Sequence, residues 1–355
     1  MNGKYFLKFM DTESLDGVLQ LLERELTPEL RDYYIWKYNG TPSNQLGVVI
    51  DTASSEAIGF NALISTSAMF EGESYNVAQS VDLVVHSDFR KQGIMRFLCG
   101  ELYKNCKENG VDFLIGWTAR HAPAWYGFID LGWNDIGLMA VLAYPIKPFK
   151  AVKLLDLGSA KSLIIGTGLW LRKLVKHTRT IRSDDLVLDR GSWNYEEILK
   201  CWKKSLKPGT AAVNRSLQFY RTRFAKSMWP PHEFMPISVW KNEEIVCFAI
   251  CLVHDFEEGR EGIIADLHAV EGCDNGLRLV INECVKYFKM NDADYIRSWG
   301  KKPEWVLKQL VSDGFIVRNR NLCFRLFSLL EGDKMDARLY DFERWDLDLC
   351  DSDHI

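Results

Sequence analysis

The sequence lacks the features that would place the protein in a membrane or on nucleic acid. A membrane-spanning helix needs about 20 apolar residues, but the longest apolar run away from the expected strands, Leu163–Leu171, is short and interrupted. The net charge of −4 gives no excess of basic residues for general nucleic-acid binding. No signal peptide is expected, because no basic segment followed by a long apolar run opens the chain. These absences predict a cytoplasmic protein with no membrane insertion and no nucleic-acid partner.

The nine cysteines lack the spacing of a zinc site. There is no Cys-x-x-Cys pair or Cys/His cluster, and most cysteines lie in apolar runs, as Cys247 and Cys251 do. Such cysteines are typical of reduced thiols in the core of a cytosolic protein. We therefore expect no bound metal.

A chain of 355 residues exceeds what one hydrophobic core usually organises, and this chain contains an internal repeat. Asp112–Trp117 resembles Asp294–Trp299, and in each copy a glycine followed by an aromatic residue lies 15 residues beyond the tryptophan. These glycine–aromatic pairs are Gly132-Trp133 and Gly314-Phe315. Two further matches lie upstream in the same order: Val81-Asp82-Leu83 with Ala265-Asp266-Leu267, and Tyr33–Tyr38 with Phe219–Phe224. Several weak matches in one order indicate a duplication.

Hydrophobic periodicity in each copy predicts a mixed α/β sandwich rather than an alternating βαβ run. The clearest helix covers Gly93–Asn109, and Gly110 ends it. We expect a first domain over 1–148, a partly helical linker over 149–185, a degenerate second copy over 186–330 and an acid-rich surface tail over 331–355.

The most informative segment joins an apolar strand directly to a helix through Arg90-Lys-Gln-Gly93. The start of a helix offers unpaired N–H groups and the positive end of the helix dipole, which together suit a pyrophosphate. A glycine lets the backbone approach the phosphates closely. An ordinary turn before a helix is the alternative interpretation.

This segment resembles motif A of the GNAT (Gcn5-related N-acetyltransferase) superfamily, a strand Leu-x-Val-x-Pro followed by Arg/Gln-x-x-Gly-x-Gly/Ala. The matching residues are Leu83, Val85, Arg90 and Gly93, whereas Ser87 replaces the proline and Met95 the small last residue.

A second pattern of the superfamily, Asn-x-x-Ala-x-x-x-Tyr-x-x-x-Gly-Phe, resembles the segment from His121 to Trp133. Every spacing is kept, but His121 replaces the asparagine and Phe128 the tyrosine. The resemblance covers residues 5–145, with a fainter echo over 186–330.

The resemblance implies a CoA-dependent N-acyltransferase with two tandem GNAT-like domains, the second degenerate. Acyl-CoA would be the co-substrate, with one molecule per chain, since the corresponding loop of copy two, Ala269–Gly276, is acidic and lacks the Arg-x-x-Gly. The residues that would hold acyl-CoA are Leu83, Val84, Val85, Arg90, Lys91, Gln92, Gly93, Ile94, Met95, Ala124 and Phe128.

The implied mechanism is direct attack of a free amine on the thioester, with a backbone N–H near Val84 or Val85 stabilising the oxyanion. Asp82 would align the amine or accept its proton, although its repetition as Asp266 also suits a structural residue. His121 could act as the base or bond to backbone beside the pantetheine. Tyr126 could replace the missing tyrosine acid or simply pack, and no acid is needed if the departing sulfur takes the proton.

Doubled chains of this length resemble enzymes that acylate dTDP-linked amino-dideoxysugars for surface polysaccharides such as O-antigen, using acetyl or 3-hydroxybutanoyl donors. The resemblance implies a nucleotide sugar as acceptor, and we expect the second copy to contribute packing and part of the acceptor pocket. Residues proposed to bind it are Tyr34, Trp36, Lys37 and Trp117, whose aromatic members suit stacking on a base or sugar, or else form core. A FemX-like aminoacyl transferase of peptidoglycan synthesis, a non-catalytic CoA-binding module and a homodimer all stay open.

Overall fold

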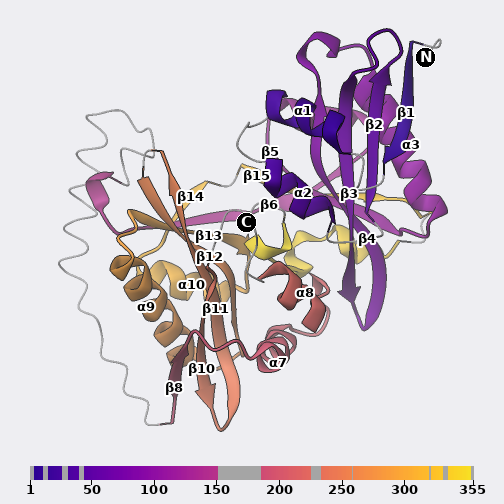
Figure 1. Cartoon of the computed structure of the whole chain (residues 1–355). Helices are drawn as coiled ribbons and strands as arrows, with labels where there is room; N and C mark the ends of the chain where they lie inside the picture. Colours follow the sequence, from indigo (N-terminus) through magenta and orange to yellow (C-terminus); the bar gives the residue numbers. More distant parts are fainter. Residues whose placement is uncertain are drawn as a thin grey trace.

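The computed structural model describes residues 4–10, 15–25, 31–39, 44–150, 185–224, 233–257, 259–319, 321–330 and 335–352. These residues form two lobes that one hydrogen-bonded sheet path connects (Figure 1). The expected linker over 149–185 lies almost wholly outside the described residues.

The first half of the chain folds as a largely antiparallel sheet with helices on both faces. Its elements are β1 (Tyr5–Met10), α1 (Asp16–Glu25), α2 (Arg31–Asn39), β2 (Gln45–Asp51), β3 (Ala57–Phe70), β4 (Glu73–Val85), η3 (Ser87–Phe89), α3 (Ile94–Glu108), β5 (Phe113–Ala119), α4 (Pro123–Asp130), β6 (Asn134–Leu138) and β7 (Ala140–Pro145). Strands β1 to β4 are antiparallel neighbours, whereas β5 runs parallel to β4. Helix α3 is the predicted helix, and it makes the crossover between these two parallel strands.

The second half repeats this order of elements. It consists of β8 (Val187–Arg190), α7 (Tyr195–Ser205), β9 (Ala211–Val213), α8 (Leu217–Arg223), β10 (Met235–Lys241), β11 (Glu244–Phe256), β12 (Gly259–Ala269), α9 (Asp274–Met290), β13 (Tyr295–Lys301), α10 (Glu304–Asp313), β14 (Ile316–Asn319), β15 (Leu322–Ser328), η5 (Ala337–Tyr340), η6 (Phe342–Arg344), β16 (Trp345–Asp348) and η7 (Leu349–Asp351). Strand β8 pairs with β10 as β1 pairs with β2, and β12 is parallel to β13 as β4 is to β5. The duplicated mixed α/β fold predicted from the sequence is confirmed.

The two halves exchange their last strands. Strand β7 lies between β13 and β14 of the second half, and β15 lies between β5 and β6 of the first. Trp117 and Trp299, which correspond in the repeat, meet with ring centroids 6.3 Å apart. The ranges 1–148 and 186–330 thus follow the sequence repeat, whereas each lobe also contains strands from the other half: β7 in the second lobe, and β15 and the short β9, which pairs with β3, in the first.

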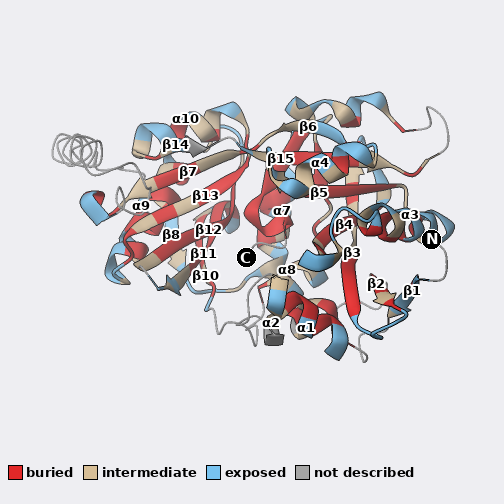
Figure 2. Ribbon diagram, turned by 90° about the horizontal axis from the view of Figure 1, so that it is seen from above, coloured by how far each residue is buried: buried red, intermediate tan, exposed pale blue. Residues whose placement is uncertain are grey.

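Different neighbours cover the two faces of the first sheet, whose strands are largely buried (Figure 2). Helices α3 and α4 cover the face that carries Ala78 and Leu114. Helices α1 and α2 cover part of the opposite face, around Val81. The second half of the chain covers the rest of that face, around Phe113 and Trp117.

The C-terminal segment is not the surface tail that its acidic composition predicted. Trp345, Leu347 and Leu349 are buried, and Asp348 and Asp351 are only 1% and 5% exposed. The prediction was wrong because apolar residues alternate with the acidic ones and buried cations neutralise the carboxylates, as Arg215 does for Asp348 and Asp351.

Within the described stretches, no helix combines the length and apolar character that crossing a membrane requires.

Arg325 on the exchanged strand β15 fixes helix α4 of the first half. Its side chain is buried, with Nε donating to Asp135 and Nη1 to the carbonyl of Trp125 at 3.0 Å. The guanidinium also lies 5.5 Å from the centroid of the Trp125 ring. The position of α4 therefore depends on a residue nearly 200 positions away in the chain.

We predict that Arg325→Leu lowers the free energy of unfolding by about 2–4 kcal/mol, because the Trp125 carbonyl loses its buried donor and Asp135 loses its cation, keeping only the Trp125 indole N–H. Arg338→Leu is the matched control, since this arginine is half-exposed in surface ion pairs with Asp336 and Glu71 and should cost below about 1 kcal/mol. Urea denaturation measures both changes. Equal losses in the two variants would contradict the anchoring role of Arg325.

Candidate functional site

Strands β4 and β5 pair over only part of their lengths. Their register runs from Val77↔Phe113 to Gln79↔Ile115 and then stops, although β4 continues to Val85 and β5 to Ala119. Beyond this point the outer edges of β4 and β5 pair with β3 and β15. The described strands therefore diverge, and their facing edges expose backbone N–H and C=O groups that a ligand can bind.

A β-bulge at Asp82 marks the start of this divergence. The register between β3 and β4 shifts there, and Asp82 has a positive φ of 51°. A bulge bends its strand and interrupts pairing. The second half has a bulge at the corresponding place, where the register between β11 and β12 shifts beside Asp266.

The Asp82 carboxylate is tied to helix α2. The Tyr38 hydroxyl donates to it, and the Lys37 ammonium lies 2.6 Å away. In the second half, Tyr220 of α8 likewise donates to Asp266 at 3.3 Å. Because both copies bond this aspartate to the equivalent helix, the geometry favours an aligning and structural role for Asp82.

The segment from His86 to Gly93 leads from the wide end of the gap into α3. Gly93 is the N-cap with a φ of 79°, and Lys91 also has a positive φ of 63°. Lys91, Gln92 and Gly93 are exposed, whereas Ile94 is buried in the core. The first amides of α3 have no partner within the helix and lie at the positive end of its dipole. This end of the gap is therefore suited to a diphosphate.

Glu25 at the end of α1 supports this loop, and sequence reasoning missed it. Its carboxylate accepts from the Ser87 N–H at 2.9 Å and from Arg90 Nη2 at 2.6 Å. Although burial opposes the change, these two donors lower the pKa of Glu25. Arg90 is exposed but already paired with a carboxylate of the protein, and Lys91 is a second exposed cation in the segment. No sequence motif links Glu25 to a loop more than 60 residues away.

The remaining expected cofactor residues pack beneath the gap. Phe128 is buried and meets Trp133 edge-on, with centroids 4.8 Å apart. Met95 packs against Gly127 of α4, and Ala124 joins the same cluster. Along β4, Leu83 and Val85 face this cluster, whereas Val84 faces α1 and α2.

His121 and Tyr126 lie together just beyond the end of β5. The Tyr126 hydroxyl is 3.5 Å from His121 Nδ1, and the ring of Trp125 is 5.1 Å from the imidazole. Both His121 and Tyr126 are exposed. Asp82 is instead bonded to α2 on the opposite face of the sheet, so these three residues do not form one cluster.

The residues expected at the acceptor site are dispersed. Tyr34 is buried and stacks on Tyr38 at 6.1 Å, so it belongs to the core, the alternative that the sequence had left open. The Trp36 side chain lies outside the described residues. Trp117 packs on Phe324 at 5.4 Å, and its buried indole N–H has no hydrogen-bond partner among the described residues.

The matching gap in the second half is filled by the chain itself. Strands β12 and β13 pair from Glu261↔Tyr295 to Ile263↔Arg297 and then diverge. There β16 pairs with β13 at Gly300 and Lys301, on the edge opposite β7. This C-terminal strand therefore occupies the place that is open in the first half.

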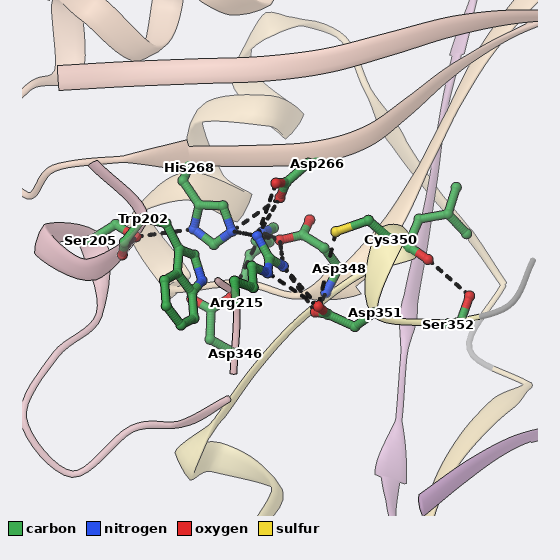
Figure 3. A network of polar contacts seen from close by, with 12 residues as sticks. Trp202, Ser205, Arg215, Asp266, His268, Asp346, Asp348, Cys350, Asp351 and Ser352 are labelled. Atoms are coloured by element: carbon green, nitrogen blue, oxygen red, sulfur yellow. Dashed lines mark hydrogen bonds and ion pairs between the residues drawn. The ribbon is translucent and has the colours of Figure 1, made fainter. Parts of the chain in front are cut away.

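A buried charge network holds the C-terminal segment in that gap (Figure 3). Arg215 lies 2.8 Å from Asp266 and 3.0 Å from Asp351, and His268 Nε2 lies 2.8 Å from Asp348. Burial opposes ionisation, but Arg215 lowers the pKa of Asp266 well below its usual range. The trio Asp266, His268 and Asp348 has metal-like spacing. However, Arg215 Nη1 is 2.9 Å from His268 Nε2, so the guanidinium already supplies the positive charge.

Comparison with known proteins defines the class to which this fold corresponds. A GCN5-related N-acetyltransferase from Anabaena variabilis ATCC 29413 matches with a TM-score of 0.64 and 10% identity, over 92% of this chain and 73% of its own. A protein of unknown function and probable N-acyltransferase from Enterococcus faecalis V583 matches with a TM-score of 0.63 and 9% identity, over 92% and 72%. N-myristoyltransferase of Saccharomyces cerevisiae with bound myristoyl-CoA matches with a TM-score of 0.61 and 11% identity, over 92% and 83%.

At these identities the structures establish the fold alone. The sequence adds a domain assignment, because residues 7–133 match the acetyltransferase (GNAT) domain family. No curated protein matches the chain in sequence. The chain therefore carries a GNAT domain in its first half, and the class of enzyme that this domain defines is the CoA-dependent N-acyltransferases.

We predict that calorimetric titration finds one CoA site per chain, because the C-terminal segment fills the second gap. Lys91→Glu should weaken CoA binding about tenfold by placing a carboxylate beside the diphosphate. Glu271→Lys, in the corresponding loop of the second half, is the control and should leave both affinity and stoichiometry unchanged. A second CoA site in the wild-type protein or in Glu271→Lys would contradict this interpretation.

The buried histidine of the network predicts a pH-dependent stability. Burial and Lys302 oppose protonation of His268, but Asp266 and Asp348 prevail and raise its pKa above the usual value. A raised folded-state pKa contributes stability that is complete below about pH 6.5, the ordinary histidine value, and is lost as pH rises through the folded pKa.

We therefore expect the free energy of unfolding to fall as the pH rises above about 6.5, and His268→Gln to remove most of that decline. Urea denaturation at several pH values measures the slope. The exposed His121→Gln serves as control and should keep the wild-type slope. An identical slope in His268→Gln would show that His268 does not contribute.

Proposed function

We propose that this protein transfers an acyl group from acyl-CoA to the amino group of a dTDP-linked amino-dideoxysugar, with an acetyl or 3-hydroxybutanoyl-type donor. One observation carries the donor assignment: the gap between β4 and β5 is open, and the exposed start of α3 lies at its wide end. The acceptor assignment rests on the resemblance of the duplicated chain to nucleotide-sugar N-acyltransferases.

In this proposal the diphosphate of CoA binds the amides from Lys91 to Met95, and the pantetheine arm pairs with the exposed edge of β4. A backbone N–H near Val84 or Val85 stabilises the oxyanion as the amine attacks. The nitrogen–acyl bond forms as the carbon–sulfur bond breaks, and thiolate leaves. Positioning of the two substrates supplies much of the acceleration.

Two side chains of the protein are candidate acceptors for the proton of the attacking amine. His121 is exposed beside Tyr126 at the end of β5, where Trp125 and Tyr126 offer aromatic surface to a sugar or base. Asp82 is already bonded to Lys37 and Tyr38. We therefore propose His121 as the general base, Tyr126 as its partner and Asp82 as the residue that aligns the site.

The test is release of CoA thiol by the full-length protein with acetyl-CoA and a panel of dTDP-amino sugars, free amino sugars and peptides. Turnover restricted to dTDP-amino sugars supports the proposal. Turnover only with peptides, or with none of the amines although CoA binds, contradicts the acceptor assignment.

Substitution of the two candidate bases separates their roles. His121→Gln should lower kcat at least about 100-fold and remove the acidic limb of the pH–rate profile, because general-base catalysis is lost. Asp82→Asn should lower kcat/KM about tenfold but keep that limb, as expected of an aligning residue. The reverse pattern would make Asp82 the base. Circular dichroism checks that both variants fold.

A further inference from the structure

In the proposed binding mode, the acyl group of the donor points into the narrow end of the β4–β5 gap. The exposed start of α3 lies at the wide end, so a donor whose thioester carbonyl lies near Val84 or Val85 extends its acyl group towards Gln79 and Ile115, where the strands are paired. The residues next to this point, Ser80 and Gly116, therefore limit the room beyond the thioester.

Trp133 closes the narrow end on the face covered by α3 and α4. A Cβ atom on Gly116 would lie 3.4 Å and 3.6 Å from two ring atoms of Trp133. The ring is buried, and its N–H donates to the Tyr103 hydroxyl at 3.0 Å. Phe128 packs against it edge-on at 4.8 Å. The Trp133 ring is thus held beneath β5, and moving it would cost the packing and hydrogen-bond energy of these contacts.

Polar and aromatic side chains surround the rest of the narrow end. Asn61 is fully buried and accepts from the Ser80 hydroxyl at 3.3 Å. On the opposite face, Trp117 packs between Phe324 at 5.4 Å and Trp299 at 6.3 Å. Core side chains therefore stand on both faces where a long acyl chain would have to continue.

We infer that Trp133 is a specificity-determining residue that restricts the donor to a short acyl chain, acetyl or a group of a few carbons. The inference rests on the proposed use of acyl-CoA and deepens it. The likeness to a myristoyl-CoA enzyme concerns the fold alone and does not decide chain length. A long chain would have to displace packed aromatic rings, and pockets discriminate against such excess volume.

Calorimetry with the full-length protein tests the inference, with CoA, acetyl-CoA, butanoyl-CoA and octanoyl-CoA as ligands. We expect CoA and acetyl-CoA to bind with similar affinity and octanoyl-CoA to bind at least about tenfold more weakly. Octanoyl-CoA that binds as tightly as acetyl-CoA would overturn the inference. Failure of CoA itself to bind would instead overturn the proposed function, so the two outcomes are distinct.

Variants assign the restriction to Trp133. Trp133→Ala should bring octanoyl-CoA to within about threefold of acetyl-CoA, because the removed ring leaves a cavity below the gap. Phe315→Ala, at the corresponding position of the second half, is the matched control and should keep the wild-type ratio.

The opposite change is Gly116→Ala, which adds a methyl group against the ring and should penalise butanoyl-CoA relative to acetyl-CoA. It keeps the inference testable if Trp133→Ala does not fold, as thermal unfolding would show. Unchanged ratios in Gly116→Ala and in a folded Trp133→Ala would overturn the role of Trp133.

Discussion

The divergence of two parallel strands is the constraint on which the rest of the site depends. Hydrogen bonding between β4 and β5 ends at Gln79 and Ile115, and β4 contains a bulge at Asp82 just beyond that point. A backbone that loses its strand partner must find another, which makes the open edge a binding surface. Tyr38 and Lys37 hold the bulge from one face, and the Glu25–Arg90 pair fixes the loop at the wide end.

Each half of the chain contains a pair of parallel strands that diverge, but the two gaps differ. Both halves contain the bulge, the aspartate, and the tyrosine that bonds it. In the first half the facing edges of β4 and β5 stay unpaired among the described residues beyond Gln79 and Ile115, whereas in the second half β16 pairs with the edge of β13. Filling that gap brought Asp348 and Asp351 into the interior, where Arg215 and His268 compensate their charge. Two features of the second half therefore oppose binding of a second donor: the buried C-terminal segment beside β13, and the acidic loop Ala269–Gly276.

Strand exchange makes the two halves interdependent. Helix α4, which carries Tyr126, is fixed by Arg325 from β15, and Trp117 at the gap packs on Phe324 and Trp299 from the second half. Although the GNAT domain match covers only residues 7–133, the geometry of its site relies on side chains from beyond residue 290. The second half thus packs against the candidate site through Arg325, Phe324 and Trp299.

Local sequence pattern determined the duplication, the helix α3, the loop ending at Gly93 and the absence of a matching loop in the second half. These features follow from short-range periodicity and from residues such as glycine whose backbone preference acts locally. The exchange of β7 and β15, the Glu25–Arg90 pair, the burial of residues 345–352 and the placement of Tyr34 in the core were decided by the tertiary structure alone. Each depends on partners far apart in the chain, since an acidic or aromatic residue acquires its role only from the charges and rings that fold against it.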